Sequence, residues 1–319
     1  MDKSYAQQQV QFDLTATQYS YRRNTYLNAS AVDYRAAWLW SLTPRLTGTL
    51  SADQVSTPIS YANLQSPAND NMRENSTRRL TVDWWVDNGW HLVGDTSSLR
   101  SQSDGGALTA TGNYDQTSVE GGVKYVSAAN NSITAVRREI RGDYLGRPLS
   151  YRQADSELRG VWQLTGLSQI DGKFGYTQRT YSLAERDYGG TSGTLSYRYT
   201  PTGKLQVTLA TGRDLVPNLE STSSYFVSDY IALTPAWLLS DKTTLSLRLN
   251  VNRNDYRGAV VPTAAMREDR IRSAQLSAAW RPARTITVDG YLTHEQRSSN
   301  FSQLPYNDNI VGVSALMRF

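Results

Sequence analysis

The sequence of 319 residues contains no cysteine and only two histidines, and both shortages restrict its chemistry. Without cysteine the chain has no disulfide framework, no thiol nucleophile and no cysteine-based zinc site. His91 lies beside a predicted turn and His294 near the far end of a predicted strand, so the two do not share a site, whereas a Ser/His hydrolase needs clustered residues. No glycine-rich phosphate loop follows a strand. We therefore expect a protein that is not an enzyme, with no catalytic residue and no cofactor.

Metal-binding signals are weak as well. The segments 70–71 and 307–309 are rich in Asn and Asp and could hold a cation. Loop Asn and Asp more often serve turn chemistry, because their side chains bond to nearby backbone. We therefore expect no metal site.

Long apolar stretches are also missing. Hydrophobic residues make up 39% of the chain and the mean hydropathy is −0.53. No segment approaches the roughly 18 apolar residues of a transmembrane helix. A transmembrane β-barrel is not excluded, because its polar lumen-facing residues dilute the apolar ones that face lipid. The first nine residues lack the apolar part of a signal peptide, so we expect a mature or trimmed form. The net charge of +4 and the pI of about 9.1 are too mild to favour nucleic acid.

The last ten residues show the pattern that organises the chain. Val311, Val313, Ala315, Met317 and Phe319 alternate with more polar residues, so a strand would place them on one face. A closing strand with a terminal aromatic residue is typical of bacterial outer-membrane β-barrels. The alternative is an ordinary soluble strand that ends in phenylalanine.

The same alternation predicts strands at residues 9–22, 31–42 and 46–55, and a hairpin unit then recurs about every 40 residues. Turn-forming residues predict tight turns at 43–45, 87–89, 128–131, 165–167, 201–203, 239–242 and 282–284. Longer polar loops are predicted at 23–30, 57–72, 102–113, 143–151, 184–191, 214–223, 256–266 and 298–308.

This sorting of short and long connections predicts an all-β fold, a transmembrane antiparallel β-barrel of about 16 strands. Short periplasmic turns, longer extracellular loops and both ends in the periplasm are the usual arrangement of such barrels. A β-propeller is the alternative for a repeat of this length, but each repeat supplies two long strands and no blade motif recurs. We expect residues 1–319 to form a single barrel domain in the bacterial outer membrane, with a flexible periplasmic start at residues 1–8.

Aromatic residues support the membrane prediction. Phenylalanine is scarce, with 5 residues, while there are 20 tyrosines and 8 tryptophans, the residues that favour membrane–water interfaces. Every tryptophan lies within a few residues of a predicted tight turn, which indicates an aromatic girdle at the periplasmic end. The alternative is tryptophan that packs a soluble core at strand ends. The eight are Trp38, Trp40, Trp84, Trp85, Trp90, Trp162, Trp237 and Trp280.

Charged residues on the strand face opposite the apolar one are predicted to line the lumen. An unpaired charge that faces lipid would cost about 2–4 kcal/mol at mid-membrane. A solvated, salt-bridged wall is one interpretation, and a polar track that contacts passing sugars is the other. At about 16 strands, side chains do not fill the interior. The loop at 60–75 could fold inward as a constriction, and the alternative is a plain surface loop. The candidates are Asp33, Arg35, Asp53, Arg79, Asp83, Glu120, Lys124, Glu157, Arg159, Asp171, Lys173, Arg179, Arg198, Arg248, Asp289, Glu295, Arg297 and Arg318.

Three segments resemble a known family. Residues 27–50, residues 83–92 with their Trp84-Trp85 pair, and residues 280–319 are similar to EpsL-type proteins, the β-barrels of exosortase-associated exopolysaccharide operons. The resemblance implies an outer-membrane barrel in a broader porin superfamily that exports a secreted polysaccharide. The Asp-Asp-Asn segment usual in that family is not found before Val10, so a trimmed barrel or a higher strand count is expected. The shared motifs mark no reactive residue.

The sequence therefore predicts a channel that exports exopolysaccharide through a polar, mixed-charge lumen. The alternatives are a general or small-solute porin, a barrel-wall enzyme and an adhesion barrel whose loops bind. The expected partners are the outer-membrane bilayer with its lipopolysaccharide, the polysaccharide, and periplasmic or inner-membrane export components.

Overall fold

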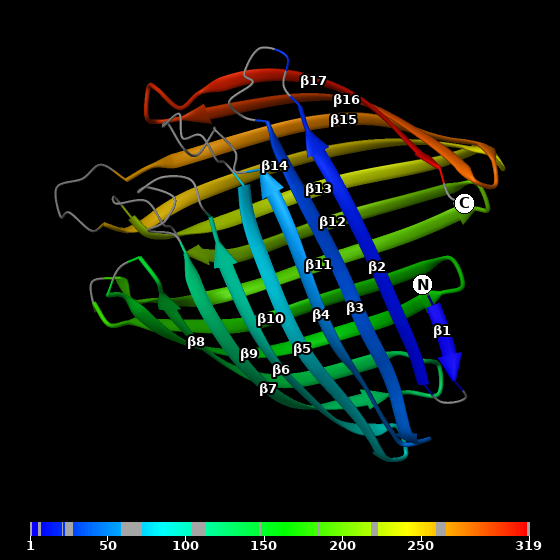
Figure 1. Ribbon diagram of the computed structural model, residues 1–319, viewed down its shortest axis with the longest axis vertical. Helices are drawn as coiled ribbons and strands as arrows, with labels where there is room; N and C mark the ends of the chain where they lie inside the picture. The colour runs from blue at the N-terminus through cyan, green and yellow to red at the C-terminus, as the bar shows by residue number, and fades with distance from the viewer. Residues whose placement is uncertain are drawn as a thin grey trace. The chain divides into compact units, whose positions relative to one another are not determined.

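The computed structural model describes residues 2–5, 8–20, 22, 28–58, 72–103, 113–146, 148–183, 186–217, 223–259 and 266–317. In this part of the chain the regular structure is all β-strand (Figure 1). No helix of the described residues is long and apolar enough to cross a membrane. The chain divides into two compact units. Unit 1 comprises residues 1–128, 133–157 and 177–189, and unit 2 comprises residues 129–132, 158–176 and 190–319.

Sixteen long strands follow one short strand, in agreement with the predicted count. The first three predicted strands correspond to β2, β3 and β4. The strands are β1 (Asp2–Tyr5), β2 (Gln8–Tyr19), β3 (Ala29–Thr43), β4 (Leu46–Pro58), β5 (Met72–Asp87), β6 (Trp90–Gln102), β7 (Tyr114–Val126), β8 (Ser132–Tyr144), β9 (Ser150–Thr165), β10 (Ser168–Tyr181), β11 (Tyr188–Thr202), β12 (Leu205–Pro217), β13 (Ser223–Ser240), β14 (Thr243–Ala259), β15 (Glu268–Ala283), β16 (Ile286–Ser299) and β17 (Tyr306–Met317).

Strands that follow one another in the sequence pair antiparallel. In unit 1 each strand from β2 to β7 pairs with the next, and in unit 2 the same holds from β11 to β17. Every connection between these strands is therefore a hairpin, as expected for an up-and-down barrel rather than a sandwich.

The amino terminus differs from its prediction. The sequence predicts a flexible start at residues 1–8, but Asp2–Tyr5 form β1, which pairs antiparallel with residues 8–11 of β2. Backbone hydrogen bonding to the neighbouring strand explains why this polar segment is ordered without an apolar pattern of its own.

Short turns alternate with longer loops, as the sequence indicates. The turn between β5 and β6 is Asn88-Gly89, with φ of 49° and 82°. Both residues have positive φ, which a two-residue turn of type I′ requires and which favours this pair of residue types. A Cβ on Gly89 would lie 2.2 Å from the carbonyl oxygen of Val126, so glycine is needed for space as well. Most of the longer loops lie outside the described residues.

Each unit has one apolar and one polar sheet face, because side chains alternate along every strand. On the apolar face Leu14, Phe174 and Val313 are 63%, 66% and 77% exposed. A water-soluble protein rarely exposes so many large apolar side chains in a continuous band. Contact with lipid removes the free-energy cost of exposing apolar side chains to water. The apolar face is therefore the membrane-facing side, and the polar face is the lumen side.

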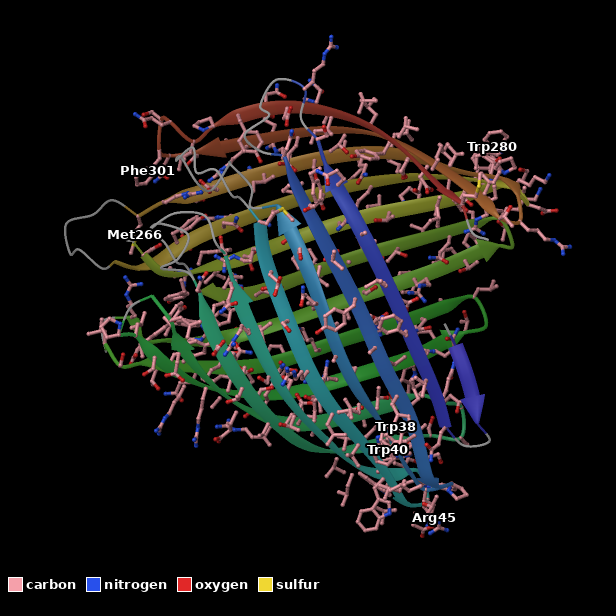
Figure 2. The ribbon with its side chains drawn as sticks, viewed as in Figure 1. Trp38, Trp40, Arg45, Met266, Trp280 and Phe301 are labelled. Carbon is pink, nitrogen blue, oxygen red and sulfur yellow. The ribbon has the colours of Figure 1, made fainter. Side chains whose placement is uncertain are left out.

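Seven of the eight tryptophans lie on the apolar face, beside the tight turns. Figure 2 shows Trp38 and Trp40 near the turn that contains Arg45 in unit 1. In unit 2, Trp280 lies at the turn end, while Met266 and Phe301 lie at the opposite end. Trp85 is the exception: it pairs with His91, whose neighbours on the polar face are charged, and the Arg45 guanidinium lies 5.4 Å from its ring centroid. This placement is the girdle that the sequence predicts.

Candidate functional site

The polar face of unit 1 carries ion pairs at the tight-turn end. The Asp83 carboxylate accepts a hydrogen bond from Lys124, and its Oδ1 is 2.5 Å from His91 Nδ1. Register explains the arrangement, because His91 lies opposite Lys124 and one strand from Asp83. Each of the three groups is thus partnered, and together they form part of the wall rather than an isolated reactive centre.

A larger ion-pair network lies further along the same face. Arg138 of β8 is 3.5 Å from Glu120 of β7, 3.5 Å from Asp155 and 3.0 Å from Glu157 of β9. Thr177 of β10 donates a 2.8 Å hydrogen bond to Asp155. Arg138 therefore contacts three carboxylates from its two neighbouring strands. Arg79 forms a separate pair with Asp95. We name the group of Glu120, Arg138, Asp155 and Glu157 the Arg138 network.

Tyrosines gather on the polar face of unit 1 near the longer loops. The rings of Tyr114, Tyr144, Tyr151, Tyr181 and Tyr188 lie next to one another with centroids 5.6 to 6.4 Å apart. The Arg179 guanidinium lies 4.0 Å from the Tyr151 ring centroid and donates hydrogen bonds to Gln153 and to the Tyr181 hydroxyl. We call the five tyrosines and Arg179 the tyrosine cluster.

Accessibility differs within the tyrosine cluster. Tyr144, Tyr151 and Tyr188 are buried, whereas Tyr114 and Tyr181 are partly exposed. Gly142 allows the tight packing, because a Cβ there would lie 2.2 Å from the Tyr151 ring. The buried rings support the cluster, and the partly exposed ones offer ring faces to a solute.

Unit 2 has a comparable cluster at the long-loop end of its polar face. Asp269 Oδ2 accepts hydrogen bonds from Arg267 Nε at 2.9 Å, Arg267 Nη2 at 2.7 Å and Arg297 Nη2 at 2.6 Å. All three side chains are buried. The Arg267 guanidinium also lies 4.4 Å from the Tyr256 ring centroid. Next to this triad, the Tyr306 hydroxyl donates a hydrogen bond to Glu295.

The register places most of the predicted lumen residues on the polar face. Arg35 lies opposite Asp53, and Asp33 Oδ1 accepts a 2.8 Å hydrogen bond from the Ser56 backbone N–H. Arg198 lies opposite Thr208, and Arg248 opposite Gln275. Arg318 is outside the described residues. That the predicted lumen residues bind a solute stays a prediction. The remaining predicted residues, by pairing or by alternation along their strands, share this face: Arg79, Asp83, Glu120, Lys124, Glu157, Arg159, Asp171, Lys173, Arg179, Asp289, Glu295 and Arg297.

Sequence reasoning missed the residues at the centres of these groups. Arg138, Asp155 and Asp269 are not among the predicted residues, although all three are central to the polar face. Arg138 lies in a segment whose two faces both carry apolar residues, which obscures its orientation. Asp269 lies two residues before Ile271, which pairs with Arg297, so the register of β15 with β16 is the signal that was missing for it.

Some charges face outward, whereas the sequence predicts charges in the lumen. Arg100 forms a 2.7 Å ion pair with Asp115, and Arg213 a 2.6 Å pair with Asp229, on the apolar side of their strands. Both pairs lie toward the longer loops, beyond the apolar residues in the middle of the strands. Because these charges are paired and lie at the membrane surface, they avoid the free-energy cost of an unpaired charge in the middle of the membrane.

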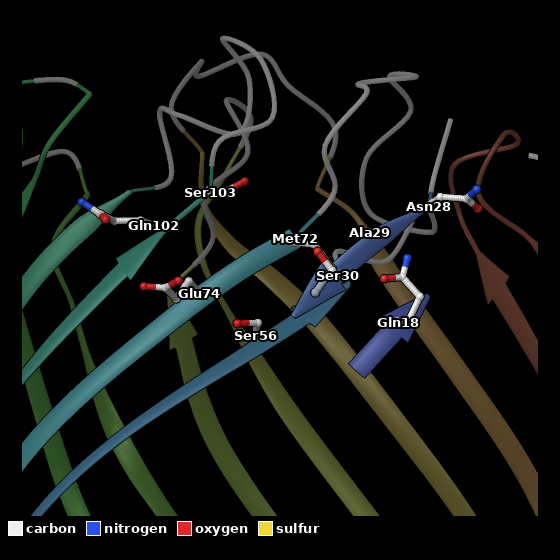
Figure 3. A pocket seen from close by; sticks show the side chains of 9 residues that line it. All are labelled: Gln18, Asn28, Ala29, Ser30, Ser56, Met72, Glu74, Gln102 and Ser103. Atoms are coloured by element: carbon white, nitrogen blue, oxygen red, sulfur yellow. The ribbon is translucent and has the colours of Figure 1, made fainter. Parts of the chain in front are cut away.

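A polar cavity of about 500 Å³ lies at the long-loop ends of β2 to β6 (Figure 3). By register, Gln18 and Ser30 are opposite each other, and Glu74 lies between Ser56 and Gln102. These five side chains belong to the outward face, beyond its apolar rows. The cavity therefore contains none of the predicted lumen residues.

The two histidines lie on different sheet faces in their respective units. His91 contacts Asp83 on the polar face, whereas His294 lies on the apolar face, with Nδ1 2.9 Å from Asn309 Oδ1. Among the described residues no group of three His, Cys, Asp or Glu could hold a metal. Of the two Asn- and Asp-rich segments, residues 70–71 lie outside the described part of the chain, and Asn307 and Asp308 belong to β17.

Comparisons with known proteins agree with an outer-membrane barrel. The family described as "Putative beta-barrel porin 2" matches residues 171–319. No curated protein matches the sequence. Among solved structures, the chain is similar to the alcaligin outer-membrane receptor FauA from Bordetella pertussis, with a TM-score of 0.59 and 13% identity over 98% of this chain and 60% of that one. It is also similar to the FrpB iron transporter from Neisseria meningitidis, with a TM-score of 0.61 and 9% identity over 100% of this chain and 64% of that one.

The chain thus spans less than two thirds of the length of these structures, and at such identity the likeness concerns the fold. Together with the two sheet faces and the tryptophan girdle, it identifies a transmembrane antiparallel β-barrel of 16 long strands. The protein is located in the bacterial outer membrane and has the architecture of a channel.

Proposed function

We propose that this outer-membrane channel exports a secreted exopolysaccharide. The observation that carries the proposal is the pairing of opposite charges along the polar face. The pair of Arg79 with Asp95, the pair of Asp83 with Lys124 and the Arg138 network each bring cations and anions together. Paired charges leave many hydrogen-bonding groups but a weak field of either sign, which suits a neutral or weakly charged polar polymer better than a selected ion.

The tyrosine cluster supports a sugar as the solute. Aromatic rings offer flat apolar faces with a polar hydroxyl at one edge, and the apolar C–H faces of sugar rings pack on such surfaces. Tyr114 and Tyr181 are partly exposed on the polar face near the longer loops. A polymer in the channel would meet these rings close to its exit. The resemblance to EpsL-type proteins points to the same solute class and to export partners in the periplasm and inner membrane.

Replacing Tyr181 with alanine is expected to weaken block of the channel by oligosaccharides. Loss of one stacking ring should raise the concentration for half block about threefold to tenfold, as expected for a contact of roughly 1 kcal/mol. The measurement is ion current through the purified protein in a planar bilayer, titrated with exopolysaccharide fragments. The matched control is Tyr176→Ala on the same strand, since Tyr176 is exposed on the apolar face.

Equal block of the wild type, Tyr181→Ala and Tyr176→Ala would contradict the role of the tyrosine cluster. Open current that no fragment blocks would favour a general diffusion porin instead.

A further inference from the structure

The outward face of unit 2 has an apolar groove with a basic end. The groove has a volume of about 510 Å³ and its apolar wall includes Leu233, Leu249 and Val251. Arg272, His294 and Gln296 line it as well. Register puts Arg272 between Val251 and Gln296, so its guanidinium borders the apolar rows on the side of the longer loops. The groove therefore offers an apolar surface next to a cationic edge.

Arg272 at the groove, and Arg270 two residues before it on the same face, have no acidic partner within the part of the chain that the structure describes. On the outward face from β12 to β15, Arg213 pairs with Asp229, Arg257 with Asp255, and Arg253 with Glu268 at 2.6, 2.7 and 2.8 Å. Arg270 and Arg272 form no ion pair with the described residues. Arg270 lies directly opposite Arg253, and the ion pair of Arg253 with Glu268 leaves Arg270 without an acidic partner of its own among the described residues. A further anion at this place would lower the repulsion between the like charges.

We propose that this groove binds lipopolysaccharide through its lipid A part, with a phosphate on Arg270 and Arg272 and an acyl chain along Leu233, Leu249 and Val251. The long-loop end faces the outer leaflet, whose lipid carries phosphates on a disaccharide directly above its acyl chains. That chemistry matches an apolar wall with a cationic edge. Arginine is suited to the phosphate, because its planar donors form paired hydrogen bonds with phosphate oxygens. His294 and Gln296 supply further polar groups for the sugar.

The test is native mass spectrometry of the barrel in detergent micelles titrated with bisphosphorylated lipid A. The wild type should be observed with one bound lipid A. At the same lipid concentration, the lipid-bound fraction of the double variant Arg270→Gln/Arg272→Gln should be at least tenfold lower. The matched control is Arg100→Gln, since Arg100 is an outward-facing arginine that already pairs with Asp115. The control should bind as the wild type does.

A second comparison needs no variant. Wild-type protein should retain bisphosphorylated lipid A more tightly than dephosphorylated lipid A and than phosphatidylglycerol. Equal retention of the three lipids would overturn the proposal, as would unchanged binding by the double variant. Inorganic phosphate that displaced lipid A completely would show an anion site without the acyl groove, which also contradicts it.

Discussion

Replacing Asp269 with alanine is expected to destabilise the folded barrel by about 3–5 kcal/mol, the usual cost of removing one partner from a buried ion pair. The side chains of Asp269, Arg267 and Arg297 are only 1%, 8% and 3% exposed. Without the carboxylate, two guanidinium groups would remain close together and buried, each with its hydration lost. The Asp269→Ala change should therefore open the long-loop end of β15 and β16 first.

Urea unfolding in detergent micelles, followed by tryptophan fluorescence, measures this loss. The control is Asp289→Ala on the polar face of β16, because Asp289 forms no ion pair with the described residues. Its effect should stay within about 0.5 kcal/mol, as for most surface substitutions. If both variants unfolded at the same urea concentration as the wild type, the ion pairs of Asp269 with Arg267 and Arg297 would not stabilise the barrel.

Replacing Arg138 with glutamine is expected to make the channel cation-selective. The change removes a positive charge that contacts Glu120, Asp155 and Glu157, so the negative charge of this part of the polar face would rise. Because Arg138 is 31% exposed, water compensates in part, and the stability cost should be about 1–3 kcal/mol. The reversal potential in a potassium chloride gradient measures the selectivity.

The matched control is Arg137→Gln, one residue earlier on β8. Arg137 has the opposite side-chain direction and donates a 2.6 Å hydrogen bond to Ser156. The same charge is lost, but outside the lumen, so the reversal potential should not move. A shift of equal size in both variants would show that the Arg138 network does not line the path of the ions.

Alternation made much of the fold predictable. Val311 and Val313 indicated the apolar face of the last strand, and the register confirms this by pairing them with Leu292 and Gly290. Turn chemistry located the connections, because Asn88-Gly89 has few conformations other than a tight turn. Alternation also predicted which side chains of a strand point to the polar face, as for Asp289 and Glu295.

Interactions between strands were not predictable from alternation. The register of β7, β8 and β9 decides that Arg138 meets Glu120 and Glu157, and no pattern within one strand contains that information. The depth of a charged residue in the membrane was not predictable from the sequence either. Arg270 and Arg272 share the outward face with Leu276, and only the register with the neighbouring strands shows that they lie beyond the apolar rows, toward the longer loops.

Cysteine accessibility at two adjacent residues tests the central claim, that the polar face lines a water-filled channel. The chain has no native cysteine, so single substitutions can be labelled without background. Ser277 lies on the polar face, with its hydroxyl oxygen 2.7 Å from that of Ser246, whereas Ala278 lies on the apolar face opposite Gly290. Single-channel current is recorded while a charged, water-soluble methanethiosulfonate reagent is added. We predict a stepwise fall in current for Ser277→Cys and no change for Ala278→Cys, whereas the reverse pattern, or no current through the unmodified protein, would contradict the account.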